Sequence, residues 1–449
     1  MVCDVGEDGT EIGFRIDAVQ LACFDEGVDS GGTFSAGIRS CEQPDEMTIW
    51  DWQFHGKLSP ADPAMSSIVA QMEDAMTDSY GAFVGLDVHK DAISVAVAAA
   101  GRDGEVRLLG VIPHLPDAVA KLARKLSAKH GSVEFAYEAG PCGYGVYRQL
   151  TDLGFDCRIV APSHTPVRPG NRQKNDTRDA VMLARLLRAG ELTYVWVPDP
   201  LHEAIRDLIR ARHVASHDAR QARTLIQLFL LKHGLRYEAK PWSGKHRVWL
   251  SDRRFPHAGQ QIAFQSYLNR LAQAEARKKE LEEQIAAMIP AWSLGKMVTG
   301  LQALKGIGLI IAATLVAEVG QFSRFPTPRK LMAYLGLVPG EHSSGAMVRP
   351  RGITKAGNSA LRALLFEAAW SYRTTPKIGQ WMTLRTPDVP QEAKDIAWKA
   401  QLRLNGRYRK LVGRGKKSNV AVTAVARELV GFVWDIGRRF EPQQSDVPA

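Results

Sequence analysis

Four carboxylates stand out because each follows a predicted strand or opens a predicted helix. Asp87 lies at the end of an apolar run that begins at Phe83, and Glu138 closes the run 133–137. Asp176 and Asp179 lie three residues apart at the start of a helix-like stretch, so they project from one helix face. Hard cations such as Mg²⁺ prefer oxygen ligands, and two of them about 4 Å apart stabilise the attacking and leaving oxygens of a phosphodiester displacement. The ordered set predicts a site for one or two divalent cations.

Each carboxylate taken alone has a plainer explanation. An aspartate after a strand often satisfies the amides of a turn. Acidic residues in a first helical turn often complement the helix dipole and cap exposed amides. Only the convergence of Asp87, Glu138, Asp176 and Asp179 on one place favours the metal site over these structural roles.

A serine supplies a second candidate group. Ser343-Ser344-Gly345 lies in a polar loop, and Arg349, Arg351 and Lys355 follow closely. A serine hydroxyl beside glycine, with cations nearby to stabilise developing charge, suits a nucleophile that attacks a phosphodiester. Small polar residues in a loop also form ordinary turns, and that alternative stays open.

The carboxylates need a sheet to position them, and the segment from Phe83 to about Gly190 has the pattern of one. Period-two alternation predicts a hairpin whose polar turn is 89–91. The predicted elements are strands at 83–88, 92–100, 106–112, 133–137 and 156–160, and helices at 116–130, 140–150 and from 176 onward. A three-stranded meander, a helix, and two strands separated by a helix follow in the order of the ribonuclease H-like α/β fold.

Residues from about Leu201 to Ile289 predict a helical, heavily charged arm. One long helix carries apolar residues from Ile205 to Leu231, and a second covers Tyr267–Ile289 with a heptad seam that Lys278 interrupts. The pair predicts an antiparallel coiled coil, broken near 237–260. Five arginines of the first helix either follow a phosphate backbone or form a solvated face that mediates self-association: Arg206, Arg210, Arg212, Arg220 and Arg223.

A third, mainly helical region starts near Leu301. The turn Leu304–Gly308 resembles a helix-hairpin-helix, whose glycine amides approach a phosphate, although a tight turn between core helices is the alternative. The residues predicted to bind nucleic acid here are Gly306, Gly308, Arg349, Arg351, Lys355, Asn358 and Arg362. A helix follows at 359–370, the segment 403–417 is densely basic, and a last helix closes at Phe440.

Charge is divided unevenly along the 449 residues. The net charge is +10, but residues 1–80 hold 16 acidic and 3 basic residues, a charge of −13 that leaves +23 for the rest. Such a basic body favours a polyanionic partner, most simply nucleic acid. The acidic segment lacks sustained periodicity and predicts a disordered extension upstream of a natural start at Met76, with competition for a nucleic-acid groove as the alternative.

Cysteine content and hydropathy limit the class of protein. Five cysteines without metal-ligand spacing argue against a zinc site or a disulfide framework and suit a reducing cytoplasm. No apolar stretch reaches the roughly 20 residues that a membrane span needs. We therefore expect a cytoplasmic protein that has no membrane partner.

Together these residues resemble the DEDD-type transposases of the Piv-like insertion-sequence family, relatives of the Piv DNA invertase. The resemblance covers about 83–372, and residues 1–80 have no counterpart in it. Its strongest parts are Gly85-Leu86-Asp87-Val88-His89-Lys90, Glu138-Ala139-Gly140, Asn175-Asp176-Thr177-Arg178-Asp179-Ala180, Tyr334-Leu335-Gly336-Leu337, Ser344-Gly345 and the run 352–359.

The resemblance and the sequence pattern together predict an α/β plus α protein with five segments. These are the extension 1–80, a ribonuclease H/RuvC-like catalytic domain at 81–195, a coiled-coil arm at 196–295, a mainly helical transposase domain at 296–440 and a tail at 441–449. The resemblance implies that Asp87, Glu138, Asp176 and Asp179 hold Mg²⁺. It implies that Ser344, in preference to Ser343, forms a transient phosphoserine link to DNA. It also implies a dimer to tetramer, a serine placed against a partner's carboxylates, and a bridging RNA that selects donor and target DNA.

Three other functions remain open. A Holliday-junction resolvase or other ribonuclease H-like nuclease would share the carboxylates without needing Ser344. An acetate or sugar kinase of the actin-like class also begins with a Gly-Leu-Asp hairpin, but it requires Gly-Thr phosphate loops that this sequence lacks. A degenerate copy would bind nucleic acid without cleaving it.

Overall fold

The computed structural model describes residues 80–101, 103–162, 165, 176–341, 350–380, 383 and 387–442, preceded by four strand segments. For the strand segments and for residues 176, 177, 341, 350 and 351, only the backbone is described. The chain divides into two compact units, 1–197 and 198–449. The arm and the C-terminal region, expected as separate domains, therefore fall in one unit.

A four-stranded antiparallel sheet lies in the acidic N-terminal segment. Its strands are β1 (Val2–Val5), β2 (Glu11–Asp17), β3 (Phe34–Ala36) and β4 (Ile49–His55), in the order β1-β2-β4-β3. The sequence analysis expected a disordered extension here, whereas the structure gives these four segments as strands. The missed signal is short: β2 has apolar residues at every second position, and its Ile12 and Ile16 pair with Phe54 and Trp50 of β4.

A mixed five-stranded sheet forms the centre of residues 80–197. Its strands are β5 (Ala82–Val88), β6 (Ala92–Ala99), β7 (Val106–Pro113), β8 (Val133–Glu138) and β9 (Asp156–Val160), in the order β7-β6-β5-β8-β9. The first three pair as an antiparallel meander, whereas β5–β8 and β8–β9 are parallel. The predicted strand order is confirmed, and it is consistent with a ribonuclease H-like domain.

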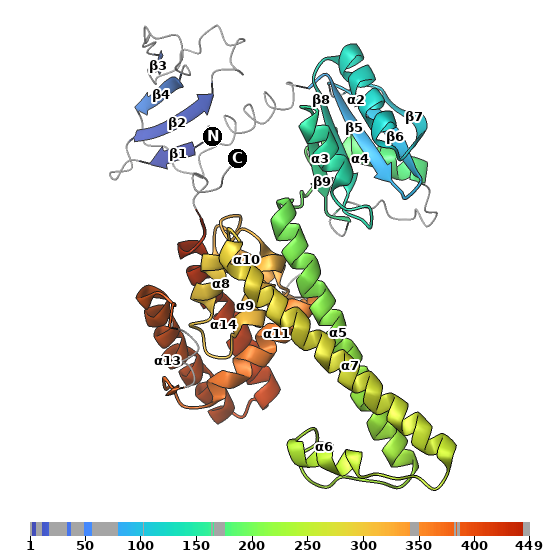
Figure 1. The fold of residues 1–449 in the computed structure, drawn as a ribbon. Helices are drawn as coiled ribbons and strands as arrows, with labels where there is room; N and C mark the ends of the chain where they lie inside the picture. Colours follow the sequence, from blue (N-terminus) through green and yellow to red (C-terminus); the bar gives the residue numbers. More distant parts are fainter. Residues whose placement is uncertain are drawn as a thin grey trace. The chain divides into compact units, whose positions relative to one another are not determined.

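Helices cover both faces of this sheet (Figure 1). Helices α2 (Pro116–His130) and α3 (Gly145–Asp152) pack on one face with Val84 and Leu86, and α4 (Asp176–Arg188) packs on the other with Phe83. Successive strand residues point to opposite faces, so β5 is buried on both sides and is apolar at nearly every position. Helix α2 has the predicted bounds because proline starts it and Gly131, at φ 75°, ends it.

The arm consists of two long helices with a short one at the far end (Figure 1). They are α5 (Pro200–Lys232), α6 (Gly244–Ser251) and α7 (Ala258–Met288). Arg212 of α5 pairs with Glu282 of α7, and the later Arg223 pairs with the earlier Glu275, so the two helices are antiparallel. Helix α7 begins nine residues before the predicted start at Tyr267. Regular coiled-coil packing between the two helices stays a prediction.

The arginines of α5 mostly bind within the protein. Arg206 Nε donates to the carbonyl oxygen of Ala317 at 2.8 Å, and Arg210 forms a bidentate pair with Glu318. Arg212 and Arg223 bind glutamates of α7. Of the five arginines predicted to follow a phosphate backbone, four therefore have carboxylate or carbonyl partners, and Arg220 is exposed.

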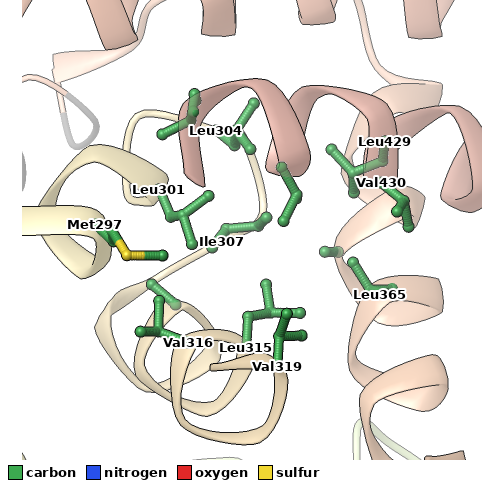
Figure 2. Close-up of a cluster of buried hydrophobic side chains, with 14 of the residues drawn as sticks. Met297, Leu301, Leu304, Ile307, Leu315, Val316, Val319, Leu365, Leu429 and Val430 are labelled. Atoms are coloured by element: carbon green, nitrogen blue, oxygen red, sulfur yellow. The ribbon is translucent and has the colours of Figure 1, made fainter. Parts of the chain in front are cut away.

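A helical body with one large core follows the arm. Its elements are η3 (Ile289–Ala291), α8 (Gly295–Leu301), α9 (Leu309–Val319), α10 (Pro328–Tyr334), β10 (Pro339–Glu341), β11 (Pro350–Ile353), α11 (Ser359–Ala369), η4 (Trp370–Arg373), α13 (Gln391–Gly413) and α14 (Ser418–Arg439). Figure 2 shows how Leu301, Ile307, Leu315, Leu365 and Leu429 point into a shared apolar interior. This core supports the hairpin formed by β10 and β11. No helix in the described part of the chain is long and apolar enough to cross a membrane.

Candidate functional site

Two of the predicted carboxylates end neighbouring parallel strands. Strands β5 and β8 pair in register from Ala82 with Val133 to Leu86 with Tyr137. Asp87 and Glu138 each come one residue after the last of these pairs. Parallel strands present their carboxyl ends at the same edge of a sheet, so the register itself brings the two carboxylates to one place.

The same two carboxylates also share a face of the sheet. Side chains alternate between the two faces along a strand, so residues an even number apart share a face. Asp87 therefore shares a face with Phe83, and Glu138 shares one with Ala136. Phe83 and Ala136 both pack in the cluster that α4 covers. Asp87 and Glu138 therefore belong to the face of the sheet on which α4, the helix of Asp176 and Asp179, is packed.

Helix α4 runs antiparallel to β5, which directs its first turn toward Asp87. Near its end, Arg188 Nη1 donates to the carbonyl oxygen of Ala99, which pairs with Ala82 at the start of β5. Ala180, near the beginning of α4, lies against Gly85.

From the contact between Ala180 and Gly85, Asp176 and Asp87 lie at similar distances along the helix and the strand. Asp176 lies four residues before Ala180, about 6 Å along a helix axis, and Asp87 lies two residues beyond Gly85, about 7 Å along a strand. The first turn of α4 therefore reaches the level of Asp87 along the sheet.

Asp87 and Glu138 line a cavity of about 770 Å³. The Nε2 atom of His89 lies 3.1 Å from Asp87 Oδ2, and His114 Nδ1 lies 2.7 Å from the carbonyl oxygen of His89. On the other strand, Thr165 Oγ1 donates to Glu138 Oε1 at 2.9 Å. The Asp87 side chain is 21% exposed, so both solvent and ligands can reach it.

Strand β8 carries a second glutamate, Glu134, on the same face as Glu138. The two glutamates differ in their partners. Burial raises the pKa of Glu134, and the guanidinium of Arg158, 3.1 Å away, opposes that rise. Glu134 is thus neutralised inside the fold. Within the described part of the chain, Glu138 has a hydroxyl partner and no cationic one. Of the two glutamates, Glu138 is the one whose charge is left for a ligand.

The turn after Glu138 is held rigidly below the cavity. Tyr137 Oη donates to the carbonyl oxygen of Gly143 at 3.0 Å and accepts from the backbone amide of Tyr147 at 3.3 Å. Burial raises the pKa of Tyr137, so this phenol stays neutral and keeps both bonds. These bonds tie the end of β8 to the start of α3, on either side of the lining residues 138–142.

The donor set at these strand ends suits a hard cation. Two carboxylates that line one cavity are the oxygen ligands such an ion prefers. Among the side chains that the structure describes, no three His, Cys, Asp or Glu groups lie close enough together to hold a metal ion. The Asp176 side chain lies outside that description, and Asp179 is half-buried on α4.

The serine loop spans residues 342–349, and Ser343, Ser344 and Arg349 all lie outside the described residues. Its two ends are described: β10 and β11 pair from Pro339 with Ile353 to Glu341 with Pro350. The two segments that flank the loop in sequence therefore pair as antiparallel strands, where the sequence analysis expected only a polar loop.

The base of this hairpin is a close crossing of two turns. A Cβ on Gly336 would lie 2.2 Å from the carbonyl oxygen of Ala356, and one on Gly357 would lie 2.1 Å from that of Tyr334. Both glycines have positive φ, 65° and 66°. Arg362 Nη1 donates to the carbonyl oxygen of Leu335 at 3.1 Å and also to that of Ala356. These contacts fix the orientation of the hairpin.

The residues predicted to bind nucleic acid occupy different environments. Gly306, at φ 85°, faces inward, since a Cβ there would lie 2.5 Å from the carbonyl oxygen of Ala368. Gly306 thus packs closely against the backbone of Ala368, and nucleic-acid binding by Gly306 and Gly308 stays a prediction. Asn358 caps α11 by accepting from the amides of Ala360 and Leu361. Lys355 is exposed, and for Arg351 only the backbone is described.

Several residues of the two sites escaped the sequence analysis. Gly85 allows the close approach of α4, and His89 and Thr165 contact the predicted carboxylates. Gly85 and His89 stand in the same short motif as Asp87, so their proximity was a usable signal. Thr165 lies in an irregular segment 27 residues after Glu138, and nothing in its local pattern marks it.

Comparison with known proteins gives a consistent assignment. A DEDD transposase model of IS110 elements matches residues 84–233, and a model described as the transposase IS116/IS110/IS902 family matches residues 298–381. The first match contains Asp87, Glu138, Asp176 and Asp179, and the second contains the serine loop and its hairpin.

Individual relatives extend over most of the chain. A putative transposase y4qE from Sinorhizobium fredii is 48% identical over 86% of this chain and 95% of its own. The transposase for insertion sequence element IS1533 from Leptospira borgpetersenii is 28% identical over 75% of this chain and 98% of its own. The chain belongs to the IS116/IS110/IS902 family of transposases, enzymes that act on DNA.

Proposed function

We propose that this transposase cuts and rejoins DNA with Mg²⁺ held by Asp87, Glu138, Asp176 and Asp179 and with Ser344 as the nucleophile. The observation that carries the proposal is the register of β5 and β8, which brings Asp87 and Glu138 into the lining of one cavity at the carboxyl ends of these strands. Helix α4 runs antiparallel to β5, which supports including Asp176 and Asp179, in its first turn, in the metal site.

The reaction is a phosphoryl transfer with a covalent intermediate. Ser344 Oγ loses its proton and bonds to the phosphorus of a DNA phosphodiester, and the bond from phosphorus to one deoxyribose oxygen breaks. The leaving oxygen takes up a proton, and the phosphodiester is conserved as phosphoserine, so a second DNA hydroxyl can attack it and restore the serine. When bound, Mg²⁺ acts as a Lewis acid on the reacting phosphate oxygens.

The chain's own groups have distinct parts in this scheme. Asp87 and Glu138 provide fixed carboxylates, since His89 and Thr165 hold their side chains from the flank. The hairpin β10–β11 delivers the serine, since its crossed glycine turns and Arg362 fix its base. Fixing the two strands that flank the loop lowers the entropy that the serine would lose on reaching its phosphate.

The proposal extends to partners. The +23 charge outside residues 1–80 supports binding of a second polyanion besides DNA, and we assign that role to a bridging RNA that selects donor and target. We also propose a dimer to tetramer in which the serine of one subunit acts with the carboxylates of another. Mixing Asp87→Asn with Ser344→Ala protein tests this arrangement: restored DNA cleavage supports it, and an inactive mixture of folded proteins contradicts it.

Mass spectrometry identifies the nucleophile. Wild-type protein is incubated with element-end DNA, RNA transcribed from the element flank and Mg²⁺, and then digested with protease and nuclease. The proposal predicts a nucleotide on the peptide at Ser344, with Ser343→Ala still forming it. Cleaved DNA without any modified serine would instead indicate a metal-dependent nuclease without serine chemistry.

A further inference from the structure

A groove of about 920 Å³ lies beside the hairpin that carries the serine loop. Residues 337, 339, 352 and 353 of the hairpin and its approach form one wall, α10 forms a second, and α13 and α14 close the remaining side. The groove therefore reaches the base of the hairpin, at Pro339 and Gly352.

The floor of the groove is apolar. Met332, Leu337, Ile353 and Phe432 line it, and their inner surfaces pack on the core of the helical body. Val420, at the start of α14, is 56% exposed and adds to this surface. Apolar side chains form no hydrogen bonds to a phosphate or to water. They suit the flat face of a nucleic-acid base instead.

The rim of the groove is basic. Five cationic side chains line it: Arg329, Lys355, Arg403, Arg407 and Arg427. Arg403 and Arg407 each place Nε 3.0 Å from a carboxylate oxygen of Glu428, the acidic residue of the lining. In the part of the chain that the structure describes, Arg329, Lys355 and Arg427 have no acidic partner, so three charges remain for an anionic ligand.

We propose that this groove binds a single DNA strand that leads to the serine loop, with phosphates at the basic rim and bases against the apolar floor. A duplex presents phosphates outward and keeps its bases stacked, so it would leave the floor unused. The choice of DNA rests on the proposed function, because the hairpin beside the groove carries the nucleophile that acts on DNA.

Binding of single-stranded DNA at several salt concentrations tests the rim. The triple variant Arg329→Gln, Lys355→Gln, Arg427→Gln is compared with Lys330→Gln, Arg409→Gln, Lys410→Gln, which removes the same charge from α10 and α13 outside the groove. Each lost phosphate contact lowers the slope of log affinity against log salt by about 0.7 for a single strand, so the groove variant should lose about 2. The control should keep the wild-type slope.

Val420→Asn tests the floor, because an exposed valine can be replaced without opening the core. We expect weaker binding of the single strand with an unchanged salt slope. If the triple variant does not fold, Lys355→Gln alone should lower the slope by about 0.7.

Three outcomes would overturn the proposal: groove variants that bind single-stranded DNA like the wild type, a loss confined to duplex DNA, or a loss confined to RNA of the same sequence. Failure of the proposed serine chemistry would look different. Ser344→Ala would then still cleave DNA, whatever the binding experiments show.

Discussion

Gly85 and Ala180 bring strand β5 and helix α4 closer together than a side chain would permit. A Cβ on Gly85 would lie 2.3 Å from the carbonyl oxygen of Ala180 and 2.5 Å from the amide nitrogen of Ala184. Both contacts are with backbone, which cannot rotate away as a flexible side chain does. Gly85 thus sets the distance between the helix that begins at Asp176 and the strand that carries Asp87.

Gly85→Ala should therefore destabilise residues 80–197 and displace α4. Overpacking of this kind costs about 1–3 kcal/mol, and urea unfolding measures it. Gly145→Ala is the control, since a Cβ there meets nothing within 4 Å. Equal stability of the two variants would contradict the close packing of β5 and α4.

Asp87→Asn and Asp179→Asn should each abolish strand cleavage and leave nucleic-acid binding largely intact. Loss of a metal-holding carboxylate removes several kcal/mol of transition-state stabilisation, so the cleavage rate should fall by at least about 10²-fold. Asp91→Asn makes the same chemical change at the exposed turn of the same hairpin and should remain active. Retained cleavage in Asp87→Asn would remove the metal-site proposal.

Arg362→Lys separates a structural from an electrostatic role. Arg362 reaches backbone carbonyls of Leu335 and Ala356, and a lysine keeps the charge but loses the fixed fork of donors. We expect lower stability by about 1–3 kcal/mol, reduced DNA cleavage and an unchanged salt dependence of DNA binding. If lysine substitutes fully while Arg362→Gln lowers the salt slope, Arg362 contacts phosphate and the structural role is wrong.

The paired Glu275 of the arm predicts a pH dependence of stability. Hydrogen bonds from Arg247, aided by Arg223, lower the pKa of Glu275 below its ordinary 4.5. A lowered folded-state pKa gives stability that is present above the unfolded pKa and disappears as the pH falls through the folded value. Urea unfolding should show Glu275→Gln less stable than wild type at pH 6, with the difference shrinking below pH 4.5.

Glu283→Gln is the matched control for this experiment. Glu283 lies on the same helix and, among the described residues, pairs with the exposed Lys279 at 3.5 Å. Exposed pairs contribute about 0–1 kcal/mol, so its replacement should have little effect at any pH. A difference for Glu275→Gln that persists unchanged at low pH would show that the ion pairs do not cause it.

The sequence predicts the sheet well because its elements obey local rules. Period-two alternation marks β6, and Pro116 with Gly131 marks both ends of α2. Asp87 and Glu138 were recognisable because each directly follows such a pattern. The parallel register that brings them together joins strands about 50 residues apart, from Ala82 with Val133 to Leu86 with Tyr137, so the fold and not a local pattern supplies it.

The remaining features depend on tertiary contacts that no local pattern reveals. The sequence gives no sign that Arg210 is paired, because its partner Glu318 lies 108 residues later in the chain. Gly306 resembles a phosphate-binding glycine in the sequence, and only the fold brings it against the backbone of Ala368. The start of α7 was missed because its first turns are polar and carry no heptad signal, although tertiary packing of Phe264 keeps them helical.

Covalent linkage between protein and DNA tests the central claim most directly. Wild-type protein and Ser344→Ala are incubated with labelled element-end DNA, flank RNA and Mg²⁺, and the products are separated on a denaturing gel. The account predicts protein-linked DNA with the wild type and neither linked nor cleaved DNA with Ser344→Ala. Equal cleavage by both proteins, without any linked product, would contradict the account and reduce Ser344 to a turn residue.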